Sequence, residues 1–73
     1  MKKITNRELQ VLKLAALETE EIASILNISK NTVKELMHRV CLKLSVKNRR
    51  QAIVKTIRLG LVEANNFIVG FER

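Results

Sequence analysis

The chain has 73 residues, the size of one small domain, and only two of them are aromatic, so aliphatic side chains must form its core. It has no proline and only two glycines, which excludes a fold rich in strands and tight turns and indicates an all-α protein. The single cysteine excludes an internal disulfide, and no Cys/His set has the spacing of a zinc site.

The positive charge is concentrated in the middle of the chain. The net charge is +7, and residues 29–59 hold nine lysines and arginines against one acid, Glu35. Residues 1–28 balance four bases with four acids, and residues 60–73 carry a slight negative charge. Such a concentration is expected of a protein that binds a polyanion.

Two helices are predicted in the first part of the chain. Thr5 and Glu8 have the spacing of a capping box, which predicts a helix over 6–16. A break follows, and Thr19 is predicted to cap a short second helix over 20–26.

The longest predicted helix spans 30–44 and follows a tight turn that ends at Ser29, a good N-cap. One apolar stripe of this helix is predicted to be buried, and it is formed by Val33, Leu36, Met37, Val40 and Leu44. The opposite side carries Asn31, Lys34, Glu35, His38 and Leu42. A short helix, a tight turn and a longer helix with a basic outer face form a helix-turn-helix, in which the second helix enters the DNA major groove.

A fourth helix is predicted over 49–59, between an Asn48 cap and a left-handed stop at Gly60. It has a second apolar stripe, and one small domain needs only one buried stripe for each helix. The second stripe therefore predicts a surface for a partner, most simply another copy of the chain, formed by Val54, Ile57, Arg58 and Leu61. For residues 63–73 the sequence leaves open a strand, a helical extension or a frayed end.

One set of residues, spread over about residues 4–62, carries a family resemblance. Its members are Thr5, Arg7, Glu8, Val11, Leu12, Glu21-Ile22-Ala23, Ile28-Ser29, Thr32-Val33-Lys34, Val40, Lys43-Leu44, Val46, Arg49, Ala52 and Gly60-Leu61-Val62. With them the chain resembles the helix-turn-helix DNA-binding domain of the LuxR/GerE family of bacterial regulators, in its stand-alone form. The segment from Lys43 to Arg49 makes the resemblance specific, because most other helix-turn-helix proteins lack it.

The resemblance implies a four-helix bundle with a central helix-turn-helix in residues 1–62, followed by a tail over 63–73. It also implies a sequence-specific transcriptional regulator of double-stranded DNA that forms a homodimer through its fourth helix. The candidate base contacts are Asn31, Lys34, Glu35 and His38. The candidate phosphate contacts are Lys30, Thr32, Arg39, Lys43, Lys47 and Arg49.

Some of these residues have a second interpretation. Thr32, Lys43 and Arg49 could support the fold instead of touching phosphate, and Arg49 could anchor the fourth helix to the third. Glu35 would repel phosphate in a groove unless its carboxylate accepts a hydrogen bond from a cytosine amino group.

No catalytic constellation is present, so an enzyme is not expected, and neither a cofactor, a metal ion nor a small-molecule ligand is predicted. The first residues lack the apolar run that a signal peptide needs, and no stretch approaches the length of about 18 apolar residues that a membrane span needs, so a cytoplasmic protein without a membrane partner is expected. RNA polymerase is a further candidate partner beside DNA and a second copy.

Two alternative functions stay open. The promoter-reading region of a sigma factor shares the Glu-Ile-Ala and Thr-Val-Lys motifs, but it ends soon after the recognition helix, and the segment 45–62 argues against it. A protein-interaction module would bind another regulator through the residues from Phe67 to Phe71. Such a module would show little salt-dependent affinity for duplex DNA.

Overall fold

The computed structural model describes residues 3–60, and the predictions made for Leu61 and for residues 63–73 lie outside this range. Within it the chain forms four helices and no strand, which confirms the all-α prediction. The helices are α1 (Asn6–Lys13), α2 (Thr19–Leu26), α3 (Lys30–Leu44) and α4 (Arg49–Arg58). Within residues 3–60, no helix combines the length and the apolar character that crossing a membrane requires.

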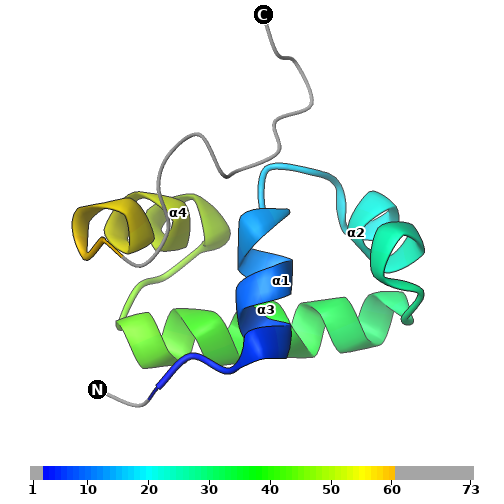
Figure 1. Ribbon diagram of the computed structural model, residues 1–73, viewed down its shortest axis with the longest axis horizontal. Helices are drawn as coiled ribbons and strands as arrows, with labels where there is room; N and C mark the ends of the chain where they lie inside the picture. The colour runs from blue at the N-terminus through cyan, green and yellow to red at the C-terminus, as the bar shows by residue number, and fades with distance from the viewer. Residues whose placement is uncertain (1–2, 61–73) are drawn as a thin grey trace, which may run out of the picture.

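The central element is α3, which packs against each of the other three helices. In Figure 1, α1 crosses the middle of α3, while α2 and α4 lie above its two ends. The predicted stripe of α3 is buried in full and meets a core formed by Val11, Leu12, Leu14, Ala15, Ile22, Ala23 and Ala52. Because the other helices all pack against this one side, the opposite side of α3 is left open.

The predicted helix caps are largely confirmed. The Thr5 hydroxyl accepts a hydrogen bond from the Glu8 N–H at 3.2 Å, and the Glu8 carboxylate accepts one from the Thr5 N–H at 2.9 Å. Ser29 and Asn48 cap α3 and α4 in the same manner, each accepting from the N–H three residues on. Gly60 follows α4 with a φ of 73°, the left-handed conformation that favours glycine.

The first helix ends earlier than predicted, at Lys13 instead of residue 16. The N–H groups of Leu14 and Ala15 bond back three residues, at 3.1 Å each, so the α-helical pattern gives way to a tighter turn. This turn directs Leu14 and Ala15 into the core and leaves Ala16 exposed. The early end therefore serves the packing of these two side chains.

The second helix begins one residue earlier than predicted, and Thr19 is its first residue and not its cap. Glu18 takes the cap position, and its N–H donates to the Glu21 carboxylate at 3.0 Å. The Thr19 hydroxyl is engaged elsewhere, because it accepts a hydrogen bond from Arg49.

Candidate nucleic-acid interface

The turn between α2 and α3 holds the two helices in a fixed relation. Asn27 ends α2 with a φ of 58°, a left-handed conformation that asparagine tolerates better than most residues. Ser29 then starts α3: its hydroxyl accepts from the Thr32 N–H at 3.1 Å and lies 2.9 Å from the Thr32 hydroxyl. The short turn thus satisfies backbone hydrogen-bonding groups at the end of α2 and at the start of α3.

The side of α3 that no other helix covers forms a continuous surface, which we call the outward face. Its members are all exposed: Asn31, Lys34, Glu35, His38 and Leu42. None of these side chains forms a hydrogen bond or ion pair with another residue of the range 3–60. Leu42 is 65% exposed and is the one apolar member. The polar groups of the outward face are therefore available to a ligand.

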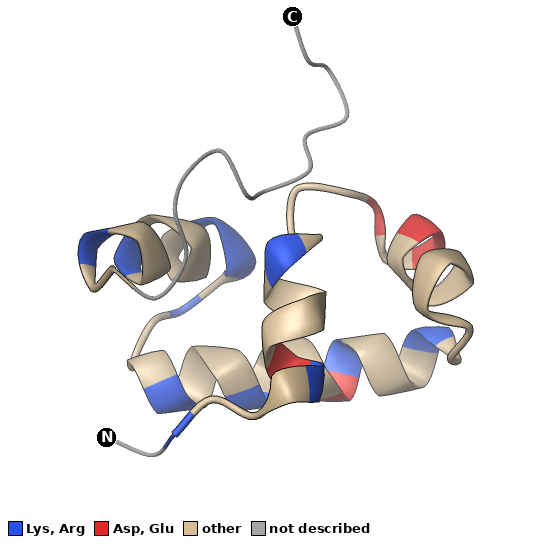
Figure 2. Cartoon of the chain, in the orientation of Figure 1, with Lys and Arg blue, Asp and Glu red and all other residues tan. Residues whose placement is uncertain are grey.

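Cations flank the outward face on both sides. Lys30 pairs with Glu20 of α2 at 3.2 Å, but both side chains are largely exposed, so this pair contributes little stability and can be exchanged for another partner. Arg39 and Lys47 are exposed as well. Figure 2 shows lysines and arginines along α3 and α4, whereas the acids gather mainly around the start of α2.

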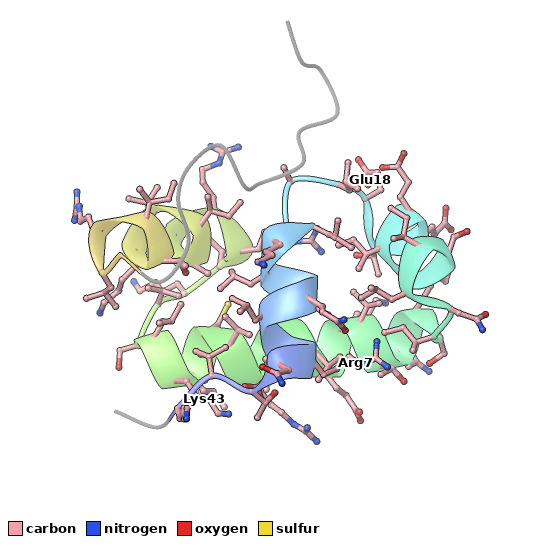
Figure 3. The ribbon with its side chains drawn as sticks, viewed as in Figure 1. Arg7, Glu18 and Lys43 are labelled. Carbon is pink, nitrogen blue, oxygen red and sulfur yellow. The ribbon has the colours of Figure 1, made fainter. Side chains whose placement is uncertain are left out.

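Lys43 forms contacts inside the protein. Its Nζ donates to the Glu8 carboxylate at 2.7 Å and to the Lys3 carbonyl at 3.0 Å. Glu8 is only 2% exposed, and the Lys43 side chain is 17% exposed. Of the two roles that the sequence left open for Lys43, these contacts correspond to support of the fold. Figure 3 labels Lys43 where the first residues of the chain pass α3.

The same pair determines the charge state of Glu8. Burial acts to raise the pKa of the Glu8 carboxyl, but the hydrogen bonds from Lys43 and Thr5 and the charge of Lys43 outweigh it. The pKa therefore lies below the ordinary value of a glutamate, and the carboxylate stays ionised within the core.

Arg49, a candidate phosphate contact, also turns inward. Its Nη1 donates to the carbonyls of Ala15 and Leu17 at 3.2 and 2.6 Å, and its Nη2 donates to the Thr19 hydroxyl at 2.9 Å. Arg49 thus fastens α4 to the turn between α1 and α2, and not to α3 as the alternative interpretation expected. No pattern in the sequence indicates these partners.

The lone cysteine lies at the edge of the core. Cys41 is half-buried, and burial raises the pKa of its thiol against the opposing effect of the Arg49 charge. A raised pKa keeps a thiol protonated and poorly nucleophilic, which fits a structural role for Cys41. Within residues 3–60, no three His, Cys, Asp or Glu residues are grouped closely enough to hold a metal ion.

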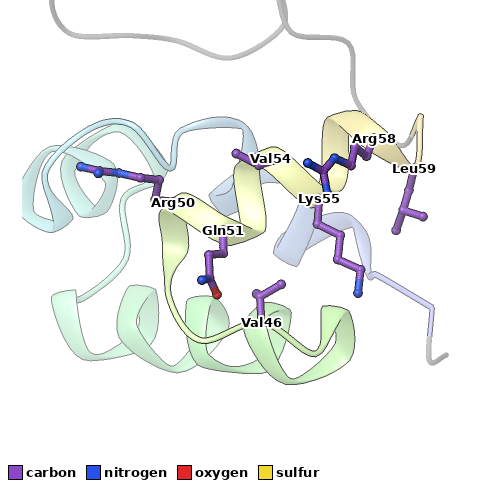
Figure 4. A pocket seen from close by; sticks show the side chains of 7 residues that line it. All are labelled: Val46, Arg50, Gln51, Val54, Lys55, Arg58 and Leu59. Carbon is purple, nitrogen blue, oxygen red and sulfur yellow. The ribbon is translucent and has the colours of Figure 1, made fainter.

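The surface of α4 combines apolar and cationic groups. Val54 is 45% exposed and Ile57 is 38% exposed, so these two apolar members of the predicted partner surface are open to solvent. Beside them lies a shallow groove of about 500 Å³, lined by Val46, Arg50, Gln51, Val54, Lys55, Arg58 and Leu59 (Figure 4). Two predicted dimer residues, Val54 and Arg58, therefore line the groove.

The sequence is similar to a family of bacterial regulatory proteins and to several individual bacterial proteins. Residues 2–56 match the model of the family described as bacterial regulatory proteins, luxR family. The chain is 42% identical over 62 residues to the spore germination protein GerE of Bacillus subtilis (strain 168), a match that covers 82% of this chain and 84% of that protein.

Two longer proteins are similar over the same part of the chain. The uncharacterized transcriptional regulatory protein YxjL of Bacillus subtilis (strain 168) is 44% identical over 61 residues, which cover 81% of this chain and 28% of YxjL. The transcriptional activator protein VanR of Vibrio anguillarum is 44% identical over 61 residues, which cover 81% of this chain and 25% of VanR. The chain thus spans about a quarter of the length of these two relatives.

Proposed function

This chain belongs to the LuxR family of bacterial regulatory proteins, and from that membership we propose that α3 reads specific base sequences in the DNA major groove. The family consists of helix-turn-helix DNA-binding transcriptional regulators and not of enzymes. We further propose that residues 1–62 form the DNA-binding unit, that the outward face of α3 contacts the bases, and that the protein binds as a homodimer.

The observation that carries the proposal is the division of α3 into two faces. The apolar stripe is held by α1, α2 and α4, while the outward face has no partner among the described residues. A B-DNA major groove admits one α-helix, which must present unpaired donors and acceptors to the base edges. The outward face meets this requirement.

Each polar member of the outward face has a chemical role in this proposal. Lys34 donates to the O6 and N7 of a guanine, and Asn31 pairs with an adenine. Glu35 accepts from the N4 amino group of a cytosine, which is the base contact that suits a carboxylate. His38 donates to or accepts from a fourth base. Together these contacts define a half-site.

The surrounding cations position the helix. Lys30, Arg39 and Lys47 are exposed and would meet phosphates, with the Thr32 hydroxyl as a further contact. We reassign Lys43 and Arg49 from phosphate contacts to positioning residues, because their donors already serve Glu8 and the turn after α1.

The direct test is selection of bound sites from random duplexes with the purified protein. We expect one enriched half-site that occurs in pairs, and affinity that falls steeply as salt is raised. Enrichment of no sequence would contradict the proposed function, and an affinity for duplexes that salt does not change would favour the protein-interaction alternative.

Lys34→Ala tests the role of the outward face. We expect operator binding to weaken by about 1–3 kcal/mol, with relaxed preference at one base position, because a base contact is lost. The measurement is a titration against the selected site and its single-base variants. Lys13→Ala is the matched control, since Lys13 ends α1 and Figure 1 shows that end pointing away from α3. An equal loss on every sequence would instead make Lys34 a phosphate contact.

We propose that a second copy covers the exposed surface of α4, with RNA polymerase as a further partner of the DNA-bound protein. Val54 and Ile57 supply the apolar centre of this surface, and Arg58 lies beside them. In a two-fold dimer the same patch faces itself, so the cations of the groove must lie at the rim, where water screens their repulsion. Leu61, the fourth predicted member, lies outside the described residues.

Ile57→Glu tests this surface. Two buried glutamates would face each other across the two-fold axis, so we expect the dimer to dissociate and binding to paired half-sites to weaken. Sedimentation at micromolar concentration measures the assembly. Ile25→Glu is the matched control, because Ile25 is the same residue type and is also exposed, at 57%, but lies on α2. A variant that stays dimeric would exclude this surface. A wild-type monomer that binds duplex DNA would favour the promoter-reading alternative.

A further inference from the structure

The chain ahead of α1 is fastened to α3. The Lys3 carbonyl accepts a hydrogen bond from the Lys43 Nζ at 3.0 Å, across 40 positions of sequence. Figure 1 shows residues 3–5 passing beside the C-terminal half of α3 before the chain enters α1. The backbone at Lys3 therefore has a defined place beside the helix.

The charge of the Lys43 ammonium is neutralised inside the protein, so Lys43 does not attract an external anion. It is paired with Glu8, and the two side chains are 17% and 2% exposed. The pair is neutral as a whole and points into the protein. By contrast, Lys3 is exposed, and its ammonium forms no ion pair within the described range. Lys43 thus holds the Lys3 backbone, while the Lys3 residue stays exposed to solvent.

The flanks of α3 place this charge beside the outward face. At about 100° per residue, Arg39 and Lys43 lie on one flank of that face, while Lys30 lies on the other. The Lys3 backbone, held by Lys43, therefore lies on the same flank as the exposed Arg39. A helix in the major groove runs between two phosphate backbones, so cations on both flanks are placed to meet one backbone each.

We propose that Lys3 is a second DNA-contacting element, which binds the phosphate backbone beside the groove that α3 enters, and that Lys43 positions it through the Lys3 carbonyl. This inference rests on the proposed function. In this inference Lys43 does not contact phosphate itself. The buried Glu8–Lys43 pair instead fixes the backbone of Lys3, and the Lys3 ammonium makes the contact.

The test is the salt dependence of binding to the selected duplex by the full chain. Lys3→Ala should lower the slope of log affinity against log salt by about 0.9, the value for one phosphate contact, and should weaken binding by one factor on all sequences. Lys13→Ala, which removes an exposed lysine at the far end of α1, should leave the slope unchanged. An unchanged slope in Lys3→Ala would overturn the inference, whereas failure of the wild type to select any sequence would overturn the proposed function.

The double variant Glu8→Gln/Lys43→Met tests the positioning by Lys43. Both new side chains are close in size to the old ones, and the double variant leaves no buried charge, so we expect it to fold; a thermal melt checks this. It should lower the slope as much as Lys3→Ala does, and adding Lys3→Ala to it should change the slope little further. If adding Lys3→Ala lowered the slope further by the full amount of one phosphate contact, Lys3 would bind phosphate without being held by Lys43, and the positioning role would be overturned. If the double variant does not fold, Lys43→Arg, which keeps the charge but changes its geometry, takes its place with the same two outcomes.

Discussion

Lys43→Met is expected to lower the free energy of unfolding by about 3–5 kcal/mol, because it leaves a buried carboxylate without its partner. Glu8 is almost fully buried, and its carboxylate lies 2.7 Å from the Lys43 Nζ. A domain of this size is stable by only about 5 kcal/mol, so the variant should be close to unfolding at room temperature. Urea denaturation followed by circular dichroism measures the change.

The chain supplies a matched control for this pair. Lys30 also pairs with a glutamate, at 3.2 Å, but both of those side chains are largely exposed. Lys30→Met should therefore change the free energy of unfolding by about 0–1 kcal/mol. Equal effects of the two substitutions would show that burial of the Glu8–Lys43 pair does not govern its contribution.

The pH dependence of stability gives the same pair a second measurement. The pKa of Glu8 is lowered in the folded protein, so Glu8 contributes stability that is complete above the pKa of the unfolded chain. That contribution is lost as the pH falls below the ordinary glutamate range and through the folded pKa. Glu8→Gln should therefore flatten this acid limb of the stability curve, while Glu20→Gln should leave it in place.

Arg49→Met is expected to lower the free energy of unfolding by about 3 kcal/mol, because hydrogen bonds from a charged donor contribute roughly 1.5–3 kcal/mol and their loss leaves carbonyls unpaired. Arg49 donates to the carbonyls of Ala15 and Leu17 and to the Thr19 hydroxyl. Its removal should loosen the segment between α1 and α2. Thermal melting measures the stability, and amide hydrogen exchange over residues 14–19 measures the loosening.

Two further variants separate geometry from charge at this position. Arg50→Met removes the neighbouring exposed guanidinium and should leave the melting temperature nearly unchanged. Arg49→Lys keeps the charge, but lysine has a single side-chain nitrogen and cannot reach the three acceptors that the two nitrogens of the Arg49 guanidinium reach. It should therefore restore only part of the stability. Full restoration by lysine would show that the charge matters and the fork of hydrogen bonds does not.

The sequence predicted those parts of the fold that depend on near neighbours. The predicted helix 30–44 coincides with α3, because Ser29 caps its start and a regular apolar stripe runs along its length. The capping box of Thr5 and Glu8 formed as its three-residue spacing indicated. These features are local, and a pattern of spacing is enough to find them.

The parts that the sequence did not predict depend on residues far apart in the chain. α1 ends at Lys13, and the carbonyls of the turn that follows accept from Arg49, 32 and 34 positions away. Lys43 is joined to Glu8 over 35 positions. The family resemblance singled out both Lys43 and Arg49, but a residue's identity does not tell whether its charge points outward to phosphate or inward to a carbonyl. Only the packing of α1 and α4 against α3 decides that.

The open side of α3 has a consequence for how such a protein can diverge. Lys34, Glu35 and His38 make no contact that the scaffold needs, whereas Lys43 and Arg49, a few positions further along, are committed to it. Mutations at the first three positions can therefore accumulate without unfolding the chain. Under the proposed function these three positions read bases, so over generations one stable fold can acquire new DNA target sequences, and related copies in one cell can come to regulate separate sets of genes.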